Sequence, residues 1–276
     1  MCIRDSHSVS PQMHNAAFKA LGLNYVYLAF EVTKEELGDA VKGLKALGAA
    51  GFNVTIPHKV AVMKYLDRLD ESAEEAGAIN AVVFRRENLV GYNTDVHGIM
   101  EALEKTDLPK DRPALIIGAG GAARAAAAAL IKLGFDQIIV ANRTVERGRQ
   151  LADWIMSKGR QACFRELWQL SSITESCGMI INATSVGMYP KIDETLLSSE
   201  DIPEDAVVLD MVYNPPKTKL LQEAEKAGAE TISGVEVLVH QGAKAFELWT
   251  GQKPPIDVMR KAALTALEGE NDEDQS

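Results

Sequence analysis

Apolar positions along this chain recur at helical spacing in some segments and form short continuous runs in others, and the two patterns alternate. Near the start, Ser10 before Pro11 is the expected N-cap of a helix, and Gly22 is its expected stop. The elements expected in this first part are helices over residues 11–21 and 34–47, an extended run over 25–30, and strands over 51–56, 81–84 and 89–92. The alternation predicts an α/β fold.

A second alternation follows a Pro-rich charged stretch, residues 108–113, which we interpret as a linker between domains. The elements expected beyond it are strands over 114–117, 137–141, 179–182, 207–211 and 230–232, and helices over 121–133, 145–156, 235–249 and 256–267. We expect the last two helices to pack back on the first domain. The predicted organisation is one domain of residues 1–97 plus 235–268, a second of residues 98–234, and an acidic tail of residues 269–276.

Composition narrows the classes of partner. With 46% hydrophobic and 25% charged residues the chain resembles an average globular protein, and its formal charge of −10 disfavours nucleic acid or an anionic membrane as a general partner. Three cysteines, Cys2, Cys163 and Cys177, form no C-x-x-C pair, so a reducing cytoplasm is the expected compartment. No apolar run reaches the roughly 18 residues of a membrane span, and the opening lacks the apolar stretch of a secretory signal. The five histidines lack metal-ligand spacing, so no metal is expected.

A glycine-rich turn joins the expected strand 114–117 to the helix after it, and it reads Gly118-Ala119-Gly120-Gly121-Ala122. In that context glycines let the backbone approach a pyrophosphate, and the start of the helix offers free N–H groups to it. The alternative is a tight turn with no ligand. The strand context favours a dinucleotide site.

The end of the next strand indicates which dinucleotide binds, because an acidic residue there favours NAD and an arginine favours the 2′-phosphate of NADP. This chain has Asn142-Arg143-Thr144, with Arg147 one helical turn beyond Arg143. Both guanidinium groups can face one phosphate, so NADP is the predicted cofactor. The alternative is that these arginines lie on a solvated helix face.

Polar clusters follow apolar elements in four places of the first domain, at residues 6–11, 53–59, 79–81 and 91–95. Hydroxyls, amides, one ammonium and one carboxylate on such loops suit a small polyhydroxy carboxylate, which needs many directional hydrogen bonds. These segments, followed in order by GAGGAAR, NRT, NATSVGM, DMVYNP and GVEVLVHQGAKAFELWTG, closely resemble the shikimate dehydrogenase family over nearly the whole chain. The resemblance implies a substrate domain and a Rossmann-type, doubly wound NADP domain flanking a cleft, and reversible reduction of 3-dehydroshikimate to shikimate in aromatic amino-acid biosynthesis.

Site residues are carried over from that resemblance. It implies that Ser8 and Ser10 hold the substrate carboxylate with Thr55 nearby, and that Lys59 and Asp95 are the catalytic pair. The other positions implied at the substrate are Asn53, Asn80, Asp95, Tyr213 and Gln241. Those implied at the cofactor are Gly118, Ala119, Gly120, Gly121, Ala122, Asn142, Arg143, Thr144, Arg147, Thr184, Met211 and Gly234.

The proposed catalytic pair also makes chemical sense by itself. Hydride addition to a ketone builds negative charge on oxygen, and a proton donor such as the Lys59 ammonium must neutralise it. The reverse oxidation needs neutral Lys59, so it should accelerate at alkaline pH. Two structural alternatives remain open: Lys59 begins a helix after Pro57, or Asp95 caps the helix near Val96.

The start of the chain departs from the family pattern, because only MCIRDS precedes His7 where relatives have an apolar strand and a Gly-x-Pro turn. Arg4 and Asp5 are poor strand residues, so we expect one neighbour in a parallel sheet to be left unpaired. Alternative functions are a quinate/shikimate dehydrogenase using NAD or NADP, and a non-catalytic nucleotide or metabolite sensor. Methylenetetrahydrofolate dehydrogenase shares the two-domain plan but not the Ser8 and Ser10 motif. A homodimer is left open as the assembly.

Overall fold

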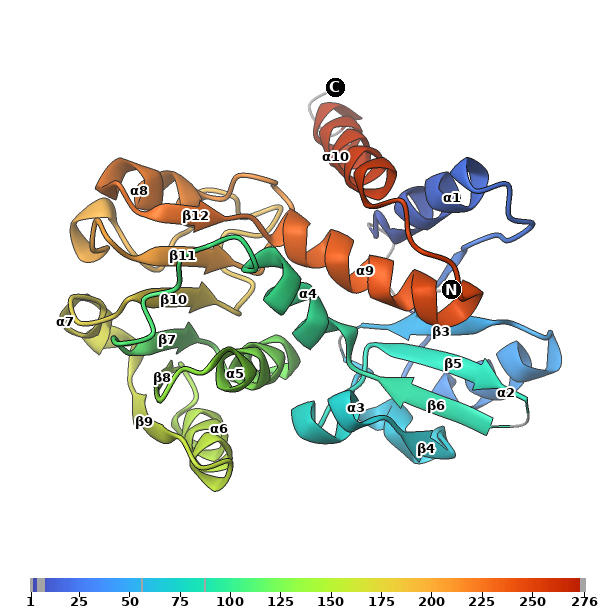
Figure 1. Cartoon of the computed structure of the whole chain (residues 1–276), viewed down its shortest axis with the longest axis horizontal. Helices are drawn as coiled ribbons and strands as arrows, with labels where there is room; N and C mark the ends of the chain where they lie inside the picture. The colour runs from blue at the N-terminus through green and yellow to red at the C-terminus, as the bar shows by residue number, and fades with distance from the viewer. Residues whose placement is uncertain (1, 4–7, 56, 87, 274–276) are drawn as a thin grey trace. The chain divides into compact units, whose positions relative to one another are not determined.

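The structure is a computed structural model that describes residues 2–3, 8–55, 57–86 and 88–273 of the chain. It divides into two compact units, residues 1–98 with 239–276 and residues 99–238. Two helices, α4 (Thr94–Ala102) and α9 (Gly234–Thr250), contribute residues to both units. Each unit carries its own sheet (Figure 1).

The first unit holds a mixed sheet of six strands in the order β2-β1-β3-β5-β6-β4. Its strands are β1 (Cys2–Ile3), β2 (Ala29–Phe30), β3 (Gly51–Val54), β4 (Arg68–Leu69), β5 (Ala81–Arg85) and β6 (Asn88–Tyr92). Its further helices are α1 (Ser10–Ala20), α2 (Leu37–Ala46), the 3₁₀ helix η1 (Ala61–Tyr65), α3 (Glu71–Ala76) and α10 (Ile256–Glu273). The late helix α10 packs against α1 (Figure 1), so the end of the chain completes the unit with which it begins.

The second unit is a parallel sheet of six strands in the order β12-β11-β10-β7-β8-β9, which can be followed by its labels in Figure 1. The elements are β7 (Ala114–Ile117), α5 (Gly121–Leu133), β8 (Gln137–Ala141), α6 (Val145–Ser157), β9 (Gln161–Arg165), η2 (Leu167–Gln169), α7 (Leu170–Thr174), β10 (Met179–Asn182), η3 (Ser199–Asp201), β11 (Val207–Asp210), α8 (Lys219–Ala227) and β12 (Glu230–Ile232). Strands β7, β10 and β11 are buried throughout, as strands covered on both faces must be. The chain runs outward from β7 to β9 and then returns to β10 on the other side of β7, which confirms the expected doubly wound sheet.

Several expectations about individual elements were wrong. Cys2–Ile3 pairs in parallel with both β2 and β3, so the neighbour expected to stay unpaired has a partner, while Arg4 and Asp5 lie outside the described residues. Ser10 is the first residue of α1 and Val9 is its N-cap, so the helix begins one residue earlier than expected and Pro11 lies in its first turn. The helix expected over residues 256–267 is longer than predicted, because α10 continues to Glu273.

The stretch 108–113 is not a linker between the units, because it lies inside the second unit and leads into β7. The expected helix over 34–47 begins only at Leu37, since the Glu36 carboxylate accepts hydrogen bonds from the backbone and hydroxyl of Thr33 and holds a turn there. Several elements were not predicted, among them β9 and α8. Strand β9 has only three apolar residues between polar ends, and α8 has its apolar residues on one narrow face.

Candidate active site

Lys59 and Asp95 form an ion pair in the first unit. Lys59 lies in the turn that follows β3, and its Nζ is 2.5 Å from Oδ2 of Asp95, which lies in the first turn of α4. The two side chains are only 16% and 12% exposed. The helix cap is a different residue, because Asn93 Oδ1 accepts from the backbone N–H of Val96 at 3.2 Å. Lys59 itself precedes η1, so neither side chain serves as a helix start or cap.

Asn80, at the start of the β5–β6 hairpin, holds this pair in place. Its side-chain amide donates to the other carboxylate oxygen of Asp95 at 2.7 Å and to Gln241 Oε1 at 3.2 Å. Its carbonyl oxygen accepts from the backbone N–H of Thr94 at 2.7 Å. Both oxygens of Asp95 are therefore engaged, one by Lys59 and one by Asn80. An ammonium has three N–H donors, and in the described part of the chain the Asp95 bond uses only one of those on Lys59.

Asn53 extends this network on β3. Its amide donates to the backbone oxygen of Asn80 at 3.0 Å, and its carbonyl oxygen accepts from the hydroxyl of Tyr27 at 2.7 Å. Tyr27 is 1% exposed, and Asn15 of α1 bonds to both its backbone N–H and its backbone oxygen. Our sequence analysis missed Tyr27, because an aromatic residue in an apolar run resembles an ordinary core residue.

The other residues expected at the substrate lie outside this hydrogen-bond network. Ser8 precedes α1 and its hydroxyl accepts from the backbone N–H of Ser10 at 3.4 Å, while Thr55 directly follows β3. Within the described part of the chain these three residues are not hydrogen-bonded to Lys59, Asp95 or Asn80. Tyr213 belongs to the second unit, where it follows β11.

The glycine-rich turn of the second unit has the shape that a phosphate ligand needs. Gly118 has φ +121°, and a Cβ there would lie 2.9 Å from the backbone oxygen of Ala183, so no other residue fits without strain. At Gly120, the N-cap of α5, a Cβ would meet no protein atom within 4 Å, and no side chain caps the helix. The start of α5, at Gly121 and Ala122, therefore has open space beside Gly120 at the positive end of the helix.

The carboxyl edge of this sheet gathers the other expected positions. Thr184 follows β10, Met211 follows β11, and Gly234 lies so close to the end of β11 that a Cβ there would be 2.4 Å from the Val212 backbone oxygen. Because all strands are parallel, these residues and the turn at Gly118 share one edge of the sheet. The strand order reverses between β7 and β10 at this edge, which is where doubly wound sheets bind their ligands.

Two arginines stand beyond the end of β8. Arg143 and Arg147 are exposed, and neither guanidinium has a hydrogen-bond or ion-pair partner among the described residues. Asn142 fixes the turn before them, since its amide donates to the backbone oxygen of Thr144 at 2.8 Å, and Thr144 is the N-cap of α6 without using its hydroxyl as a cap. The arrangement leaves two cations and a free hydroxyl for an anionic group.

A buried carboxyl, Asp210 at the end of β11, was also missed from sequence. It is fully buried, and burial raises the pKa of its side chain to about 6 although three hydrogen bonds oppose the rise. The donors are the amide of Asn182, the hydroxyl of Thr218 and the backbone N–H of Val212. Asn182 also accepts from the hydroxyl of Thr184 at 2.7 Å, so Asp210 orders the loop that carries Thr184.

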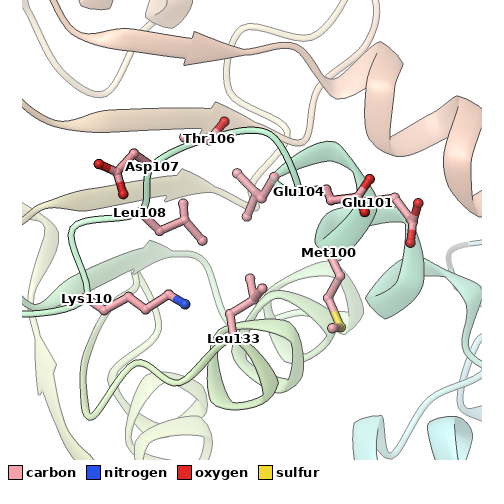
Figure 2. A pocket seen from close by; sticks show the side chains of 9 residues that line it. Met100, Glu101, Glu104, Thr106, Asp107, Leu108, Lys110 and Leu133 are labelled. Carbon is pink, nitrogen blue, oxygen red and sulfur yellow. The ribbon is translucent and has the colours of Figure 1, made fainter.

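A cavity of about 570 Å³ in the second unit lies away from this edge (Figure 2). Leu133, at the far end of α5, lines it together with Met100, Leu103 and Leu108. Its charged side chains include three carboxylates, those of Glu101, Glu104 and Asp107, and one ammonium, that of Lys110. Such a lining repels phosphate, so the cavity does not suit a dinucleotide.

Among the described residues no group of three His, Cys, Asp or Glu side chains could hold a metal ion. None of the helices in the described ranges has the length and apolar character needed to cross a membrane.

Three family models match the chain in succession. The shikimate dehydrogenase substrate binding domain matches residues 4–82, the shikimate / quinate 5-dehydrogenase model residues 101–210, and the shikimate 5'-dehydrogenase C-terminal domain residues 234–264. A shikimate dehydrogenase (NADP(+)) of Methanopyrus kandleri is 50% identical over 267 residues, which cover 95% of this chain and 92% of the relative. The chain belongs to the shikimate dehydrogenase family.

Solved structures of the family share the fold. A crystal structure of a shikimate dehydrogenase in complex with NADP+ has a TM-score of 0.90 at 47% identity, covering 96% of this chain and 93% of that one. The shikimate 5-dehydrogenase of Listeria monocytogenes in complex with shikimate and NAD has a TM-score of 0.86 at 40% identity, covering 94% and 93%. The expected family, fold class and domain types are thereby confirmed.

Proposed function

We propose that this chain is a shikimate dehydrogenase that catalyses the reversible, NADPH-dependent reduction of 3-dehydroshikimate to shikimate. The observation that carries the proposal is the state of Lys59. Its ammonium is held by one bond to an immobilised carboxylate, is largely removed from water, and keeps two N–H donors that no described residue uses. Such a group is ready to donate to a substrate oxygen.

The proton step follows from this geometry. Bound NADPH supplies the hydride that is added to the substrate carbonyl carbon. Negative charge then grows on the carbonyl oxygen, and Lys59 Nζ donates a proton to that oxygen as the hydroxyl forms. Asp95 keeps the ammonium in position and balances its charge, while Asn80 prevents the carboxylate from turning away. In the oxidation of shikimate the neutral Lys59 amine accepts the hydroxyl proton.

The substrate is held by groups that distinguish its two ends. We assign its carboxylate to the hydroxyls of Ser8, Ser10 and Thr55. The assignment for its ring hydroxyls comprises Asn53, Asn80, Asp95 and Gln241 of the first unit, with Tyr213 as a further substrate contact. Support comes from the hydrogen bonds that already join Asn53, Asn80, Asp95 and Gln241 into one network.

The second unit fits NADP. Only glycine fits at Gly118, and the space above Gly120 is open, as a pyrophosphate resting on the start of α5 requires. Arg143 and Arg147 are our candidates for the adenosine phosphate, with Asn142 and Thr144 shaping the turn beside them. The other residues assigned to the cofactor are Ala119, Gly121, Ala122, Thr184, Met211 and Gly234.

The first experiment measures NADPH formation by absorbance with shikimate and NADP, with quinate and NAD in parallel reactions. We expect fast turnover with shikimate and NADP. Comparable rates with quinate and NAD would instead support the broader quinate/shikimate activity. NADP binding without turnover on any substrate would support a sensor.

The second experiment tests Lys59. Loss of general acid–base help lowers rates by about 10²–10⁴, so Lys59→Ala should lose turnover by that factor while its dissociation constant for NADP stays unchanged. Lys64→Ala is the matched control, because Lys64 is an exposed lysine in the adjoining η1 helix. Full turnover in Lys59→Ala would refute the assignment.

The expected surroundings of the enzyme are also proposals. A reducing cytoplasm is consistent with Cys163 and Cys177, which are both free thiols, and burial raises the pKa of the Cys177 thiol to about 11. We expect a small-molecule substrate and no nucleic-acid or membrane partner, as the net charge of −10 suggests. A homodimer is the expected assembly.

A further inference from the structure

Asp210, the last residue of β11, is a buried acid whose hydrogen-bond partners are all neutral. Its carboxylate accepts from the Asn182 amide at 2.9 Å, the Val212 backbone N–H at 3.0 Å and the Thr218 hydroxyl at 2.6 Å. In the described part of the chain no cationic side chain forms an ion pair with it. Burying a carboxylate without a cation costs free energy, and such groups cluster at functional sites.

The three hydrogen bonds alone do not require an acid at this position. The single carbonyl oxygen of an asparagine accepts two hydrogen bonds, and the donors of Asn182 and Val212 already share one oxygen of Asp210. The asparagine NH2 group would donate to the Thr218 hydroxyl, which accepts from the Leu221 backbone N–H and can accept once more. Negative charge is therefore the property that distinguishes Asp210 from its neutral isostere.

The strand order indicates which half of a dinucleotide lies beside Asp210. The proposed pyrophosphate site at Gly118 follows β7, and Arg143 and Arg147, our candidates for the adenosine phosphate, lie beyond β8. In the sheet β8 lies on one side of β7, and β10 and β11 lie on the other (Figure 1). A dinucleotide that crosses the strand reversal with its adenosine half over β8 directs its nicotinamide half over β10 and β11.

Contacts around the end of β11 bring further proposed cofactor positions next to Asp210. Met211 follows it in the chain, and the Met211 N–H donates to the Asn182 backbone oxygen at 2.9 Å. A Cβ at Gly234 would lie 2.7 Å from the Asp210 backbone oxygen. Thr184 donates its hydroxyl to the same Asn182 side chain that bonds to Asp210. The carboxylate therefore lies within the group of residues that we assign to this part of the cofactor.

We propose that the Asp210 carboxylate determines selectivity for the redox state of the cofactor, because it strengthens binding of NADP relative to NADPH. The nicotinamide ring is positively charged in NADP and neutral in NADPH, whereas the phosphates are the same in both. A fixed carboxylate beside the ring attracts only the oxidised form in this way. The same attraction favours reduction of a substrate, because the ring gains positive charge as its hydride leaves. This inference rests on the proposed cofactor site.

The test is calorimetric titration of the full chain at pH 8 with NADP and, separately, with NADPH, in the absence of any substrate. Burial raises the pKa of Asp210 to about 6, so its carboxyl is ionised at that pH. One or two strand spacings, about 5–10 Å, separate the charges, which attract weakly in water and strongly in a protein interior. Asp210→Asn should therefore raise the dissociation constant for NADP, relative to that for NADPH, about three- to tenfold.

Asp153→Asn is the matched control, because Asp153 is an exposed carboxylate on α6 of the same unit and its loss changes the formal charge equally. The ratio of its two dissociation constants should equal that of the parent. A purely structural role for Asp210 predicts that Asp210→Asn weakens NADP and NADPH by the same factor, so an unchanged ratio overturns the proposal. Circular dichroism checks folding, and Asp210→Ser is a second neutral variant with the same expected rise.

Because no substrate is present, the titrations separate this inference from the proposed reaction. A rise in the ratio in a chain that turns over no substrate would support the role of Asp210 and refute the proposed reaction. A parent that binds both nucleotides, with an unchanged ratio in Asp210→Asn, would refute the role of Asp210 alone. A parent that binds neither nucleotide would overturn the cofactor assignment and this inference together.

Discussion

Lowering the pH from about 7 to about 5 should destabilise the first unit by about 2 kcal/mol through His14 alone. His14 lies on α1 with no exposed surface, and neither ring nitrogen has a hydrogen-bond partner among the described residues. Its ring stacks on Tyr27 with centroids 4.5 Å apart. Burial without a partner disfavours the charged imidazolium and lowers the pKa of His14 from 6.5 to about 3.

The direction and the magnitude of this change in stability follow from the protons that the native and unfolded states bind. Between pH 6.5 and about 3 the unfolded chain protonates this histidine and the native protein does not, so stability present above 6.5 is lost as the pH falls. Each pH unit in that window costs about 1.4 kcal/mol, and the descent from 6.5 to about 5 therefore costs about 2 kcal/mol. Asp210 acts in the opposite direction in the second unit, because its pKa of about 6 lets the native state bind a proton first. A stability measurement on the whole chain would therefore combine the opposite effects of His14 and Asp210.

The assay is urea unfolding at both pH values, with Trp249 as the reporter because its ring lies 5.2 Å from that of His14. Trp154 and Trp168 are replaced by Phe in all variants, so that fluorescence follows the first unit alone. The stability difference between His14→Phe and its parent should shift by about 2 kcal/mol in favour of the variant on going from about pH 7 to about 5. Phe18→Leu is the control.

Phe18 is a buried neighbour of His14 without a titratable group, so Phe18→Leu should be less stable than its parent by the same amount at both pH values. If His14→Phe also differs from its parent by a constant amount, the buried neutral histidine is not the source of the pH dependence.

The remaining predictions concern the nucleotide unit and the proton donor. Arg143→Ala should lower kcat/KM for NADP at least about tenfold and leave kcat/KM for NAD unchanged, because one charge-assisted hydrogen bond contributes about 1.5–3 kcal/mol. Equal losses of kcat/KM with both cofactors would contradict this prediction. Gly118→Ala should destabilise the second unit by at least about 1–3 kcal/mol in urea unfolding, because φ is +121° at this position and the Ala183 backbone oxygen leaves no room for a Cβ. An unchanged unfolding midpoint would show that the turn can relax. Initial rates should rise with pH for shikimate oxidation, since only neutral Lys59 accepts a proton, and a profile that is flat or falls from neutral to alkaline pH would count against Lys59.

Local patterns predicted the nucleotide unit well. The turn from Gly118 into α5 is set by residues adjacent in sequence, so strand, glycines and helix could be identified together. The central strands β7, β10 and β11 were visible because nearly all of their residues are apolar and buried, whereas β9 was missed because this edge strand is only half-buried. Strand β1 could not be predicted, because two residues carry no periodicity and their pairing depends on neighbours far along the chain.

Polar residues at the ends of apolar elements were the useful signal for the site, and they indicated Asn80 and Asp95. The same reasoning could not find Tyr27, whose role depends on a bond to Asn53 across 26 residues of sequence. Asp210 begins the DMVYNP segment, which is part of the family resemblance. Its burial could not be predicted, because it depends on Asn182 and Thr218, which contact it only in the folded chain.

The proposed proton donor depends on residues that meet only in the folded chain. Lys59 follows β3, Asp95 begins α4, and Asn80 opens the hairpin, with Gln241 arriving from α9 much later in the sequence. An ion pair with such small exposure is stable only if the carboxylate's other oxygen is also satisfied, and Asn80 supplies that bond. Because both oxygens of Asp95 are held, the position of the Lys59 ammonium is fixed. Its other N–H donors remain available for a substrate. The orientation of the proposed proton donor is therefore a consequence of satisfying a buried carboxylate.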